Sequence, residues 1–219
     1  MDILLVRHGE SQGNAEGRMQ GVSDYPLTDR GRAQAARLAQ FLVDHDLGWD
    51  HHFASPLSRA LETASILSSR TGRPAAELEP RLVELDAGSL SHLSFEEIHR
   101  RFPAYARRKL IELHDYEEFG GESYASVQLR ARAVRDSLEE RYRESKARVL
   151  LVGHGGFNFQ LLKLLVCEPV PRFGSVKMGN CGVTLVRMSE RRGTYHGELV
   201  FHVPNELMGR DSRSGSTPP

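Results

Sequence analysis

Two histidines that each stand beside glycine carry the strongest chemical signal in this sequence. His8 lies in VRHGES and His154 lies in VGHGG. A neutral imidazole is a nucleophile that can form a covalent intermediate, and a guanidinium group matches two oxygens of a phosphate at once. Arg7, beside His8, and Arg59, in SPLSR, are the candidate phosphate-binding groups. Their positive charges would also favour the neutral form of His8, which is the form that attacks.

Phosphoryl transfer from an ester needs two further features, a close approach of donors to the anion and a proton for the leaving oxygen. Glycine beside each histidine would let backbone N–H groups approach the anion without a side chain intervening. A carboxylic acid whose pKa is raised by partial burial and by the nearby phosphate would supply the proton and then activate water. The candidate acids are Glu84, Asp86, Glu10 and Glu122.

Short aliphatic runs would place both histidines at one edge of a sheet. Residues 3–6 and 149–152 each lead into a glycine-bearing polar loop that contains one of the histidines. Such runs are typical of strands buried on both faces of a parallel sheet, and ligands bind beyond the carboxyl ends of such strands. Residues 183–186 and 199–203 indicate further strands. We therefore expect the two imidazoles and the first arginine to share one site.

Helical patterns separate these strands. Residues 28–47 have apolar side chains at helical spacing, and Thr28 suits the N-cap. Ser55 suits an N-cap and Pro56 the first helical position, which would put Arg59 in the first turns of a helix.

The second half of the chain contains two more helix signals. Residues 94–97 have capping-box spacing, and Ser123 suits the N-cap of a long helix. One apolar stripe along that helix comprises Val127, Ala131, Val134 and Leu138. The alternation predicts an α/β three-layer sandwich, with a mostly parallel central sheet, helices on both faces and a small helical cap insertion.

Composition indicates an ordinary globular protein. The 219 residues are 39% hydrophobic and 26% charged, with 29 basic and 29 acidic side chains, so no global field would steer a polyanion. Cys167 and Cys181 lack pairing or metal-ligand spacing, and we expect free buried thiols. Residues 1–6 lack a basic segment, so we expect no signal peptide or membrane span and a cytoplasmic setting.

Four motifs in order resemble the histidine phosphatase (phosphoglycerate mutase-like) superfamily, over nearly the whole chain to about residue 187. The family's opening motif corresponds to residues 5–11 together with Asn14 and residues 20–21 and 24–28. Its helix with the second arginine corresponds to residues 55–60 and 62–64. Its acid segment corresponds to residues 82–86, and the motif of its second histidine corresponds to residues 153–156. One such motif alone would be weak, whereas four in the same order are highly specific.

The resemblance implies a role for each matching residue. His8 would be the phosphorylated nucleophile and Glu84 the proton donor. The implied phosphate and substrate site comprises Arg7, Arg59 and His154, with Asn14, Gln20, Gly21 and Gly155. No metal or cofactor would be needed. We expect residues 1–208 to form one catalytic domain and residues 209–219 to form a disordered tail. The domain would act on a small phosphorylated metabolite and would bind neither nucleic acid nor membranes. A homodimer is a candidate assembly.

Departures from the family pattern favour a phosphatase over a mutase. Many family phosphatases have Gly, Trp and Gly after the acid, whereas residues 88–93 here read GSLSHL. Residues 85–88 also lack the basic, tyrosine-bearing segment of the glycolytic mutases. We therefore predict a phosphate monoester hydrolase that acts through phosphohistidine. Cofactor-dependent phosphoglycerate mutase activity and a non-catalytic phospholigand-binding protein are the alternatives.

Other signals have simpler interpretations. A nucleotide-binding loop at 153–156 would place its third fingerprint glycine at Asn158, which is a poor match. His51 and His52 lack carboxylate or cysteine neighbours at ligand spacing, so we expect no metal site there. Residues 121–123 are expected to form a turn. The basic run Arg100, Arg101, Arg107, Arg108 and Lys109 is expected to be a solvated helix face, within the segment from about 90 to 122 where selectivity would lie.

Overall fold

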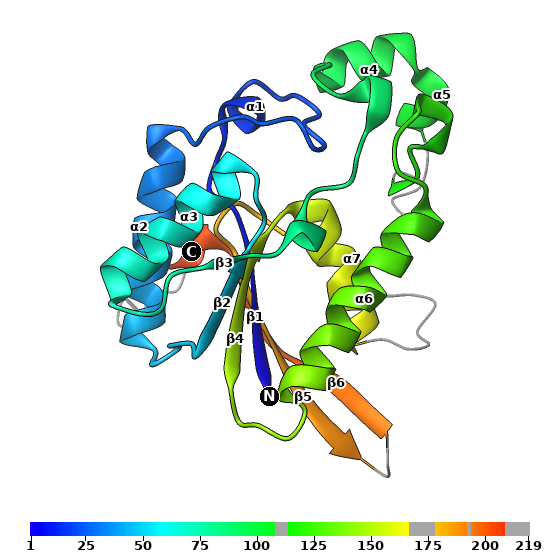
Figure 1. The fold of residues 1–219 in the computed structure, drawn as a ribbon. Coiled ribbons are helices and arrows are strands. Elements are labelled where there is room, and N and C mark those ends of the chain that lie inside the picture. The colour runs from blue at the N-terminus through cyan, green and yellow to red at the C-terminus, as the bar shows by residue number, and fades with distance from the viewer. Residues whose placement is uncertain (108–113, 167–177, 192–193, 209–219) are drawn as a thin grey trace, which may run out of the picture.

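A mixed sheet forms the centre of the molecule (Figure 1). The structure, a computed structural model, describes residues 1–107, 114–166, 178–191 and 194–208. Within these residues the strands are β1 (Asp2–Arg7), β2 (His51–Ala54), β3 (Glu77–Leu78), β4 (Arg148–Gly153), β5 (Val183–Arg191) and β6 (Thr194–Val203). The order across the sheet is β3-β2-β4-β1-β5-β6. Neighbours from β3 to β1 are parallel, whereas β5 and β6 are antiparallel additions, so the predicted mostly parallel sheet is confirmed.

The position of β1 inside the sheet explains why its sequence is continuously aliphatic. Ile3 and Leu5 belong to the hydrophobic core on one face of the sheet, Leu4 and Val6 to the core on the other, and all four are fully buried. Side chains alternate between the two faces of a strand, so a strand buried on both faces needs apolar residues at every position.

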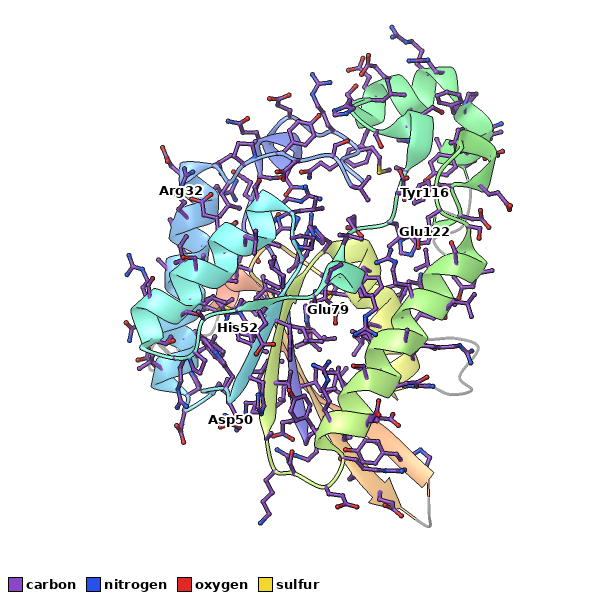
Figure 2. The ribbon with its side chains drawn as sticks, viewed as in Figure 1. Arg32, Asp50, His52, Glu79, Tyr116 and Glu122 are labelled. Carbon is purple, nitrogen blue, oxygen red and sulfur yellow. The ribbon has the colours of Figure 1, made fainter. Side chains whose placement is uncertain are left out.

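Helices cover both faces of the sheet. The described helices are α1 (Gln12–Ala15), α2 (Asp29–Asp44), α3 (Ser58–Thr71), α4 (Phe95–Arg101), α5 (Pro103–Ala106), α6 (Tyr124–Tyr142) and α7 (Gly155–Val166). Helices α2 and α3 pack together on one face, and α6 and α7 pack on the other (Figure 1). Side chains fill the space between these layers (Figure 2). The three-layer sandwich is thus confirmed.

Most predicted helix starts are confirmed. Thr28 caps α2, with its Oγ1 accepting a hydrogen bond from the backbone N–H of Gly31 at 3.0 Å, although the helix ends at Asp44 rather than at residue 47. Ser94 and Glu97 form the capping box of α4, and Ser123 caps α6. The predicted stripe of α6 is buried in the core.

The predicted start of α3 is wrong. This helix begins at Ser58 with Leu57 in the cap position, not at Ser55. The hydroxyl of Ser55 is instead within hydrogen-bond distance of the imidazole of His154. Asp24 contributes the missing cap, because its Oδ1 accepts hydrogen bonds from both the backbone N–H and the hydroxyl of Ser58, at 2.9 and 2.7 Å.

A small helical cap extends beyond the carboxyl ends of the parallel strands. It contains α4 and α5, and it lies above the sheet in Figure 1. Arg100, Arg101 and Arg107 are exposed there, whereas Arg108 and Lys109 lie outside the described residues. The predicted tail, residues 209–219, and Cys167 also lie outside them, and Cys181 is a buried free thiol. None of the described helices is long and apolar enough to span a membrane.

Candidate active site

Strand register brings the two histidines together. Arg7 at the end of β1 pairs with Gly153 at the end of β4, so His8 and His154 follow two neighbouring residues of the parallel ladder. Their ring centroids are 5.0 Å apart, with an angle of 58° between the planes. Both side chains are almost fully buried, at 2% and 0% exposure. The expectation that both imidazoles meet at one edge of the sheet agrees with this geometry.

Local contacts set the protonation of His8. Its Nδ1 lies 2.6 Å from the carbonyl oxygen of Gly9, and a carbonyl only accepts hydrogen bonds, so Nδ1 carries the proton and Nε2 keeps its lone pair. Burial lowers the pKa of His8 well below its usual value, and the charges of Arg7 and Arg59 lower it further. The imidazole is therefore neutral at neutral pH, with a nucleophilic nitrogen available.

The second histidine has a different set of partners. His154 Nε2 lies 2.8 Å from Ser55 Oγ, and its buried Nδ1 has no hydrogen-bond partner among the described residues. Burial lowers the pKa of His154 well below its usual value, and the neighbouring His8, Arg59 and Arg7 add to this effect. A bound anion beside the ring would oppose these charges and favour the protonated form.

Two arginines border the histidines. Arg7 Nη1 donates to the carbonyl of Met178 at 2.8 Å, and Arg59 donates through Nη1 and Nη2 to the carbonyls of Ser23 and Gly21, at 2.7 and 2.9 Å. Within the described chain, the buried Nε atoms of both arginines lack hydrogen-bond partners. Buried donors are normally paired, so these atoms have hydrogen-bonding capacity left for an anion.

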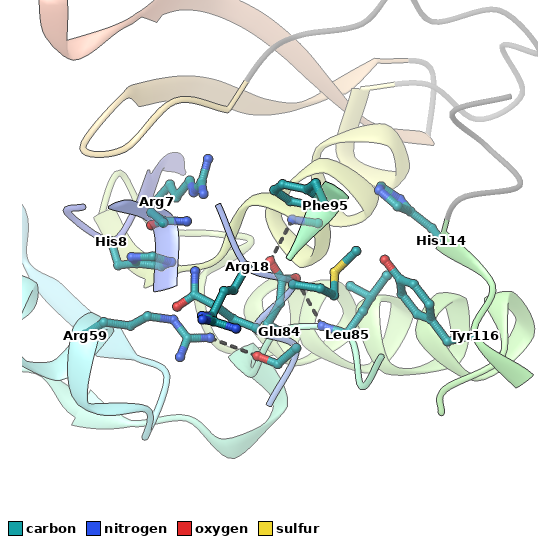
Figure 3. A pocket seen from close by; sticks show the side chains of 14 residues that line it. Arg7, His8, Arg18, Arg59, Glu84, Leu85, Phe95, His114 and Tyr116 are labelled. Atoms are coloured by element: carbon teal, nitrogen blue, oxygen red, sulfur yellow. Dashed lines mark hydrogen bonds between the residues drawn. The ribbon is translucent and has the colours of Figure 1, made fainter. Parts of the chain in front are cut away.

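Of these residues, Arg7, His8 and Arg59 line a pocket of about 180 Å³ (Figure 3), whereas His154 is not among its lining residues. Arg7, His8 and Arg59 lie at one end of it, and Glu84 lies between them and the rings of His114 and Tyr116 in the view of Figure 3. The further lining residues are Asn14, Arg18, Met19, Gln20, Gly21, Leu85, Phe95 and Gly156. Polar groups thus concentrate at the end near His8, whereas much of the remaining wall is apolar.

Glu84 is the only one of the four candidate acids that lines this pocket. Its Oε1 accepts a hydrogen bond from the backbone N–H of Phe157 at 2.9 Å, and its Oε2 accepts one from Gly156 at 3.1 Å. These N–H groups belong to the first turn of α7 and have no acceptor within the helix, so the two carboxyl oxygens of Glu84 are their partners. The helix that follows His154 therefore fixes the position of the carboxylate.

The other candidate acids have structural partners. Glu10 accepts hydrogen bonds from Thr28 and Arg30, and Asp86 accepts one from the backbone N–H of Gly88. Glu122 forms an ion pair with Arg130 at 2.6 Å, and its predicted turn is present, with Ser123 as the N-cap of α6.

The predicted auxiliary groups lie around the loop after β1. The Ser11 hydroxyl lies 3.1 Å from Asn14 Oδ1 and 2.7 Å from Gln20 Oε1, and these two oxygens share its single proton. Gly21 adopts a positive φ of 53°, and its carbonyl oxygen accepts a hydrogen bond from Arg59. Gly155 opens α7 beside Arg7, where an added Cβ would lie 3.4 Å from the guanidinium Nε.

One predicted function of glycine is wrong. The backbone N–H of Gly9 does not face the site as a free donor, because it donates to Thr63 Oγ1 at 3.0 Å. Glycine is required here for packing instead, since an added Cβ would lie 2.5 Å from the carbonyl oxygen of Gly31 in α2. In the second loop the N–H of Gly156, one residue beyond Gly155, donates to Glu84.

Several supporting residues had no signal in the sequence. Asn180 Nδ2 donates to the carbonyl of His8 and to Asn14 Oδ1, both at 3.0 Å, so it holds the loop after β1 from the other side. Arg130 donates to the carbonyls of Arg81 and Val83, at 2.8 and 2.7 Å, and so supports the segment that carries Glu84. Their partners are far away in sequence, so no local pattern could have identified them.

Comparisons with known proteins agree with this geometry. The family model described as histidine phosphatase superfamily (branch 1) matches residues 3–197. The chain is 36% identical to Phosphoserine phosphatase 1 of Hydrogenobacter thermophilus, covering 87% of this chain and 88% of that protein. It is 32% identical to the protein named probable phosphoglycerate mutase GpmB of Enterobacter sp., covering 91% of each.

Solved structures show the same fold. The mycobacterial glucosyl-3-phosphoglycerate phosphatase superposes with a TM-score of 0.76 at 28% identity, covering 93% of this chain and 99% of that one. YhfR of Bacillus stearothermophilus superposes with a TM-score of 0.75 at 30% identity, covering 91% and 96%.

Proposed function

Because the chain belongs to the histidine phosphatase superfamily, branch 1, we propose that it is a metal-independent phosphomonoesterase that forms a phosphohistidine on His8. The observation that carries this proposal is the contact of 2.6 Å between His8 Nδ1 and the Gly9 carbonyl, which leaves the Nε2 lone pair for the phosphorus atom. Burial and two arginines keep this imidazole neutral. The substrate is a small phosphorylated metabolite.

In the first half-reaction the unpaired Nε atoms of Arg7 and Arg59 donate to the nonbridging oxygens of the ester. His8 Nε2 forms a bond to phosphorus while the bond from phosphorus to the ester oxygen breaks. Glu84, in its acid form, gives its proton to the leaving oxygen. Phosphohistidine and a free alcohol result.

In the second half-reaction Glu84 acts as the base. Its carboxylate takes a proton from water, and the water oxygen bonds to phosphorus as the bond to His8 Nε2 breaks. Inorganic phosphate leaves and both side chains return to their starting forms. One carboxylate near the scissile bond therefore suffices for both proton transfers.

A trapping experiment tests this proposal. Protein quenched during turnover of a radiolabelled phosphate ester should carry an acid-labile, alkali-stable phosphoryl group, and hydrolysis of para-nitrophenyl phosphate should persist in chelator. His8→Ala should lose both the label and turnover, whereas His196→Ala, which changes an exposed strand histidine, should keep both. Turnover that needs an added metal ion, or label that remains on His8→Ala, would contradict the proposal.

Mutase activity is a second candidate because of the 32% identical protein named probable phosphoglycerate mutase. Among the described residues that line the pocket, Arg18 is the one lysine or arginine besides Arg7 and Arg59. This is few cations for binding a second phosphate group, so the pocket favours hydrolysis. An assay with 3-phosphoglycerate and a bisphosphorylated primer separates the two activities, because only a mutase would form 2-phosphoglycerate.

A further inference from the structure

The end of the pocket remote from His8 contains an imidazole that the proposed mechanism does not use. His114 lines this end together with Tyr116, and Figure 3 shows it on the far side of Glu84 from Arg7. A phosphate held at His8 directs its ester oxygen toward Glu84. The organic part of the substrate must therefore extend toward His114.

Two hydrogen-bonded glutamine amides orient this ring. Gln160 on α7 is fully buried, and its Nε2 lies 2.6 Å from His114 Nδ1. Its Oε1 accepts a hydrogen bond from Gln128 Nε2 on α6 at 2.7 Å. An amide nitrogen only donates, so Nδ1 of the imidazole accepts and the ring proton lies on Nε2. The two glutamines thus select one tautomer.

The second ring nitrogen is available to a ligand. In the part of the chain that the structure describes, Nδ1 is the only ring nitrogen of His114 with a hydrogen-bond partner. The ring packs edge to face against Phe159, with centroids 5.9 Å apart. Burial lowers the pKa of His114 from its usual value; Glu84 opposes this and Lys163 adds to it. The ring is therefore a fixed, neutral donor.

We propose that His114 is a specificity-determining residue that donates its Nε2–H to an oxygen atom on the organic part of the substrate. This inference rests on the proposed function, because it places the reacting phosphate at His8. Gln160 and Gln128 are positioning residues in this arrangement. A substrate with an acceptor oxygen, such as a carboxylate, beyond the ester linkage is favoured over the same ester without it.

Matched esters test this inference. Carboxylated alkyl phosphates of increasing chain length are each compared with the plain alkyl phosphate of the same length. Loss of one hydrogen bond changes binding by about 1 kcal/mol, so His114→Phe should raise KM about tenfold or less for carboxylated esters of matching length. Its kcat for these esters and its KM for plain esters should stay unchanged. His99→Phe, which changes an exposed histidine of α4, is the control and should alter neither.

A second variant tests the tautomer directly. In Gln160→Glu the carboxylate would accept a hydrogen bond from Nδ1–H, so the ring proton would lie on Nδ1 and Nε2 would keep a lone pair. The carboxylated esters should therefore bind worse than in the wild type. Nitrogen NMR of the ring should show the proton on Nε2 in the wild type and on Nδ1 in the variant. This measurement holds even if His114→Phe fails to fold.

Failure of this inference differs from failure of the proposed function. Wild-type turnover of both ester series with unchanged selectivity in His114→Phe would overturn the assignment of His114 alone, as would equal rises in KM for both series. A wild-type ring protonated on Nδ1 would also overturn it. Wild-type protein that hydrolyses neither series would overturn the proposed function itself.

Discussion

The hydroxyl oxygen of Ser55 lies 2.8 Å from Nε2 of His154, and both side chains are completely buried. This contact joins the loop after β2 to the loop after β4, two strands that are paired in parallel up to Ala54 and Val152. Serine at this position therefore orients the imidazole of His154, whereas its sequence context indicated a helix cap.

Ser55→Ala should lower kcat for para-nitrophenyl phosphate by about fivefold, which corresponds to the loss of one buried hydrogen bond of roughly 1 kcal/mol. The His154 ring would lose its only Nε2 partner among the described residues. Steady-state kinetics with a thermal melt separates this effect from unfolding. Ser69→Ala removes an exposed serine of α3 that bonds only to the Ile66 carbonyl, and it should leave kcat unchanged. A Ser55→Ala enzyme with wild-type kcat would show that the contact is not functional.

Glu84→Gln should slow esters with poor leaving groups far more than esters with good ones. General acid catalysis contributes about 100-fold or more when the leaving alkoxide needs a proton, and very little when it does not. Rates for an alkyl phosphate and for para-nitrophenyl phosphate give the comparison. Asp86→Asn, which changes a carboxylate bound to the Gly88 N–H outside the pocket, is the control. Equal slowing of both esters by Glu84→Gln would remove Glu84 from its proposed role.

The sequence predicted the site best where one segment supplies both strand and loop. The aliphatic residues of β1 predict a strand buried on both faces, and His8 and Arg7 follow directly from its end. The order of motifs also singled out Glu84, which lines the same pocket as His8, and its role as proton donor stays a prediction. These features depend on local patterns and on chain order.

The errors concern groups whose partners lie far away in the chain. The Ser55 hydroxyl accepts a local hydrogen bond from the Leu57 N–H at 3.4 Å, but its shorter contact, of 2.8 Å, is with a histidine 99 residues away. The helix begins only at Ser58, so the signal of Ser55 as its N-cap was misleading. The N–H of Gly9 bonds to Thr63, 54 residues away, and not to an anion. A single hydroxyl can serve as a cap or as a tertiary partner, and only the folded arrangement decides which.

Arg130→Met should lower stability and kcat together. Arg130 pairs with Glu122, donates to the carbonyls of Arg81 and Val83, and lies over the Phe157 ring at 4.3 Å. Loss of several charge-assisted hydrogen bonds in this partly buried setting should cost about 2–3 kcal/mol of unfolding free energy. The segment before Glu84 would lose its anchor, and kcat would fall. Urea unfolding and steady-state kinetics measure both effects.

An exposed ion pair provides the control for that variant. Arg32 and Glu62 lie 2.6 Å apart on the surface of α2 and α3, with side-chain exposures of 44% and 34%. Surface pairs contribute about 0–1 kcal/mol, so Arg32→Met should cost little stability and no activity. A loss as large as that of Arg130→Met would mean that the position of Arg130 beside the acid segment has no special importance.

His52 should make the protein less stable in mild acid. It lies on β2 on the side covered by α2 and α3 (Figure 2), it is 2% exposed, and burial lowers its pKa from 6.5 to about 4. As pH falls through 6.5 the unfolded chain gains a proton that the folded chain takes up only near pH 4. Stability should therefore fall between these values, by about 3 kcal/mol from this group. His52→Leu should flatten that dependence in urea unfolding at several pH values, whereas His196→Leu, at an exposed position on β6, should not. An identical pH dependence in His52→Leu and wild type would refute the assignment, since His8 and His154, whose pKa values are also lowered, would then account for all of it.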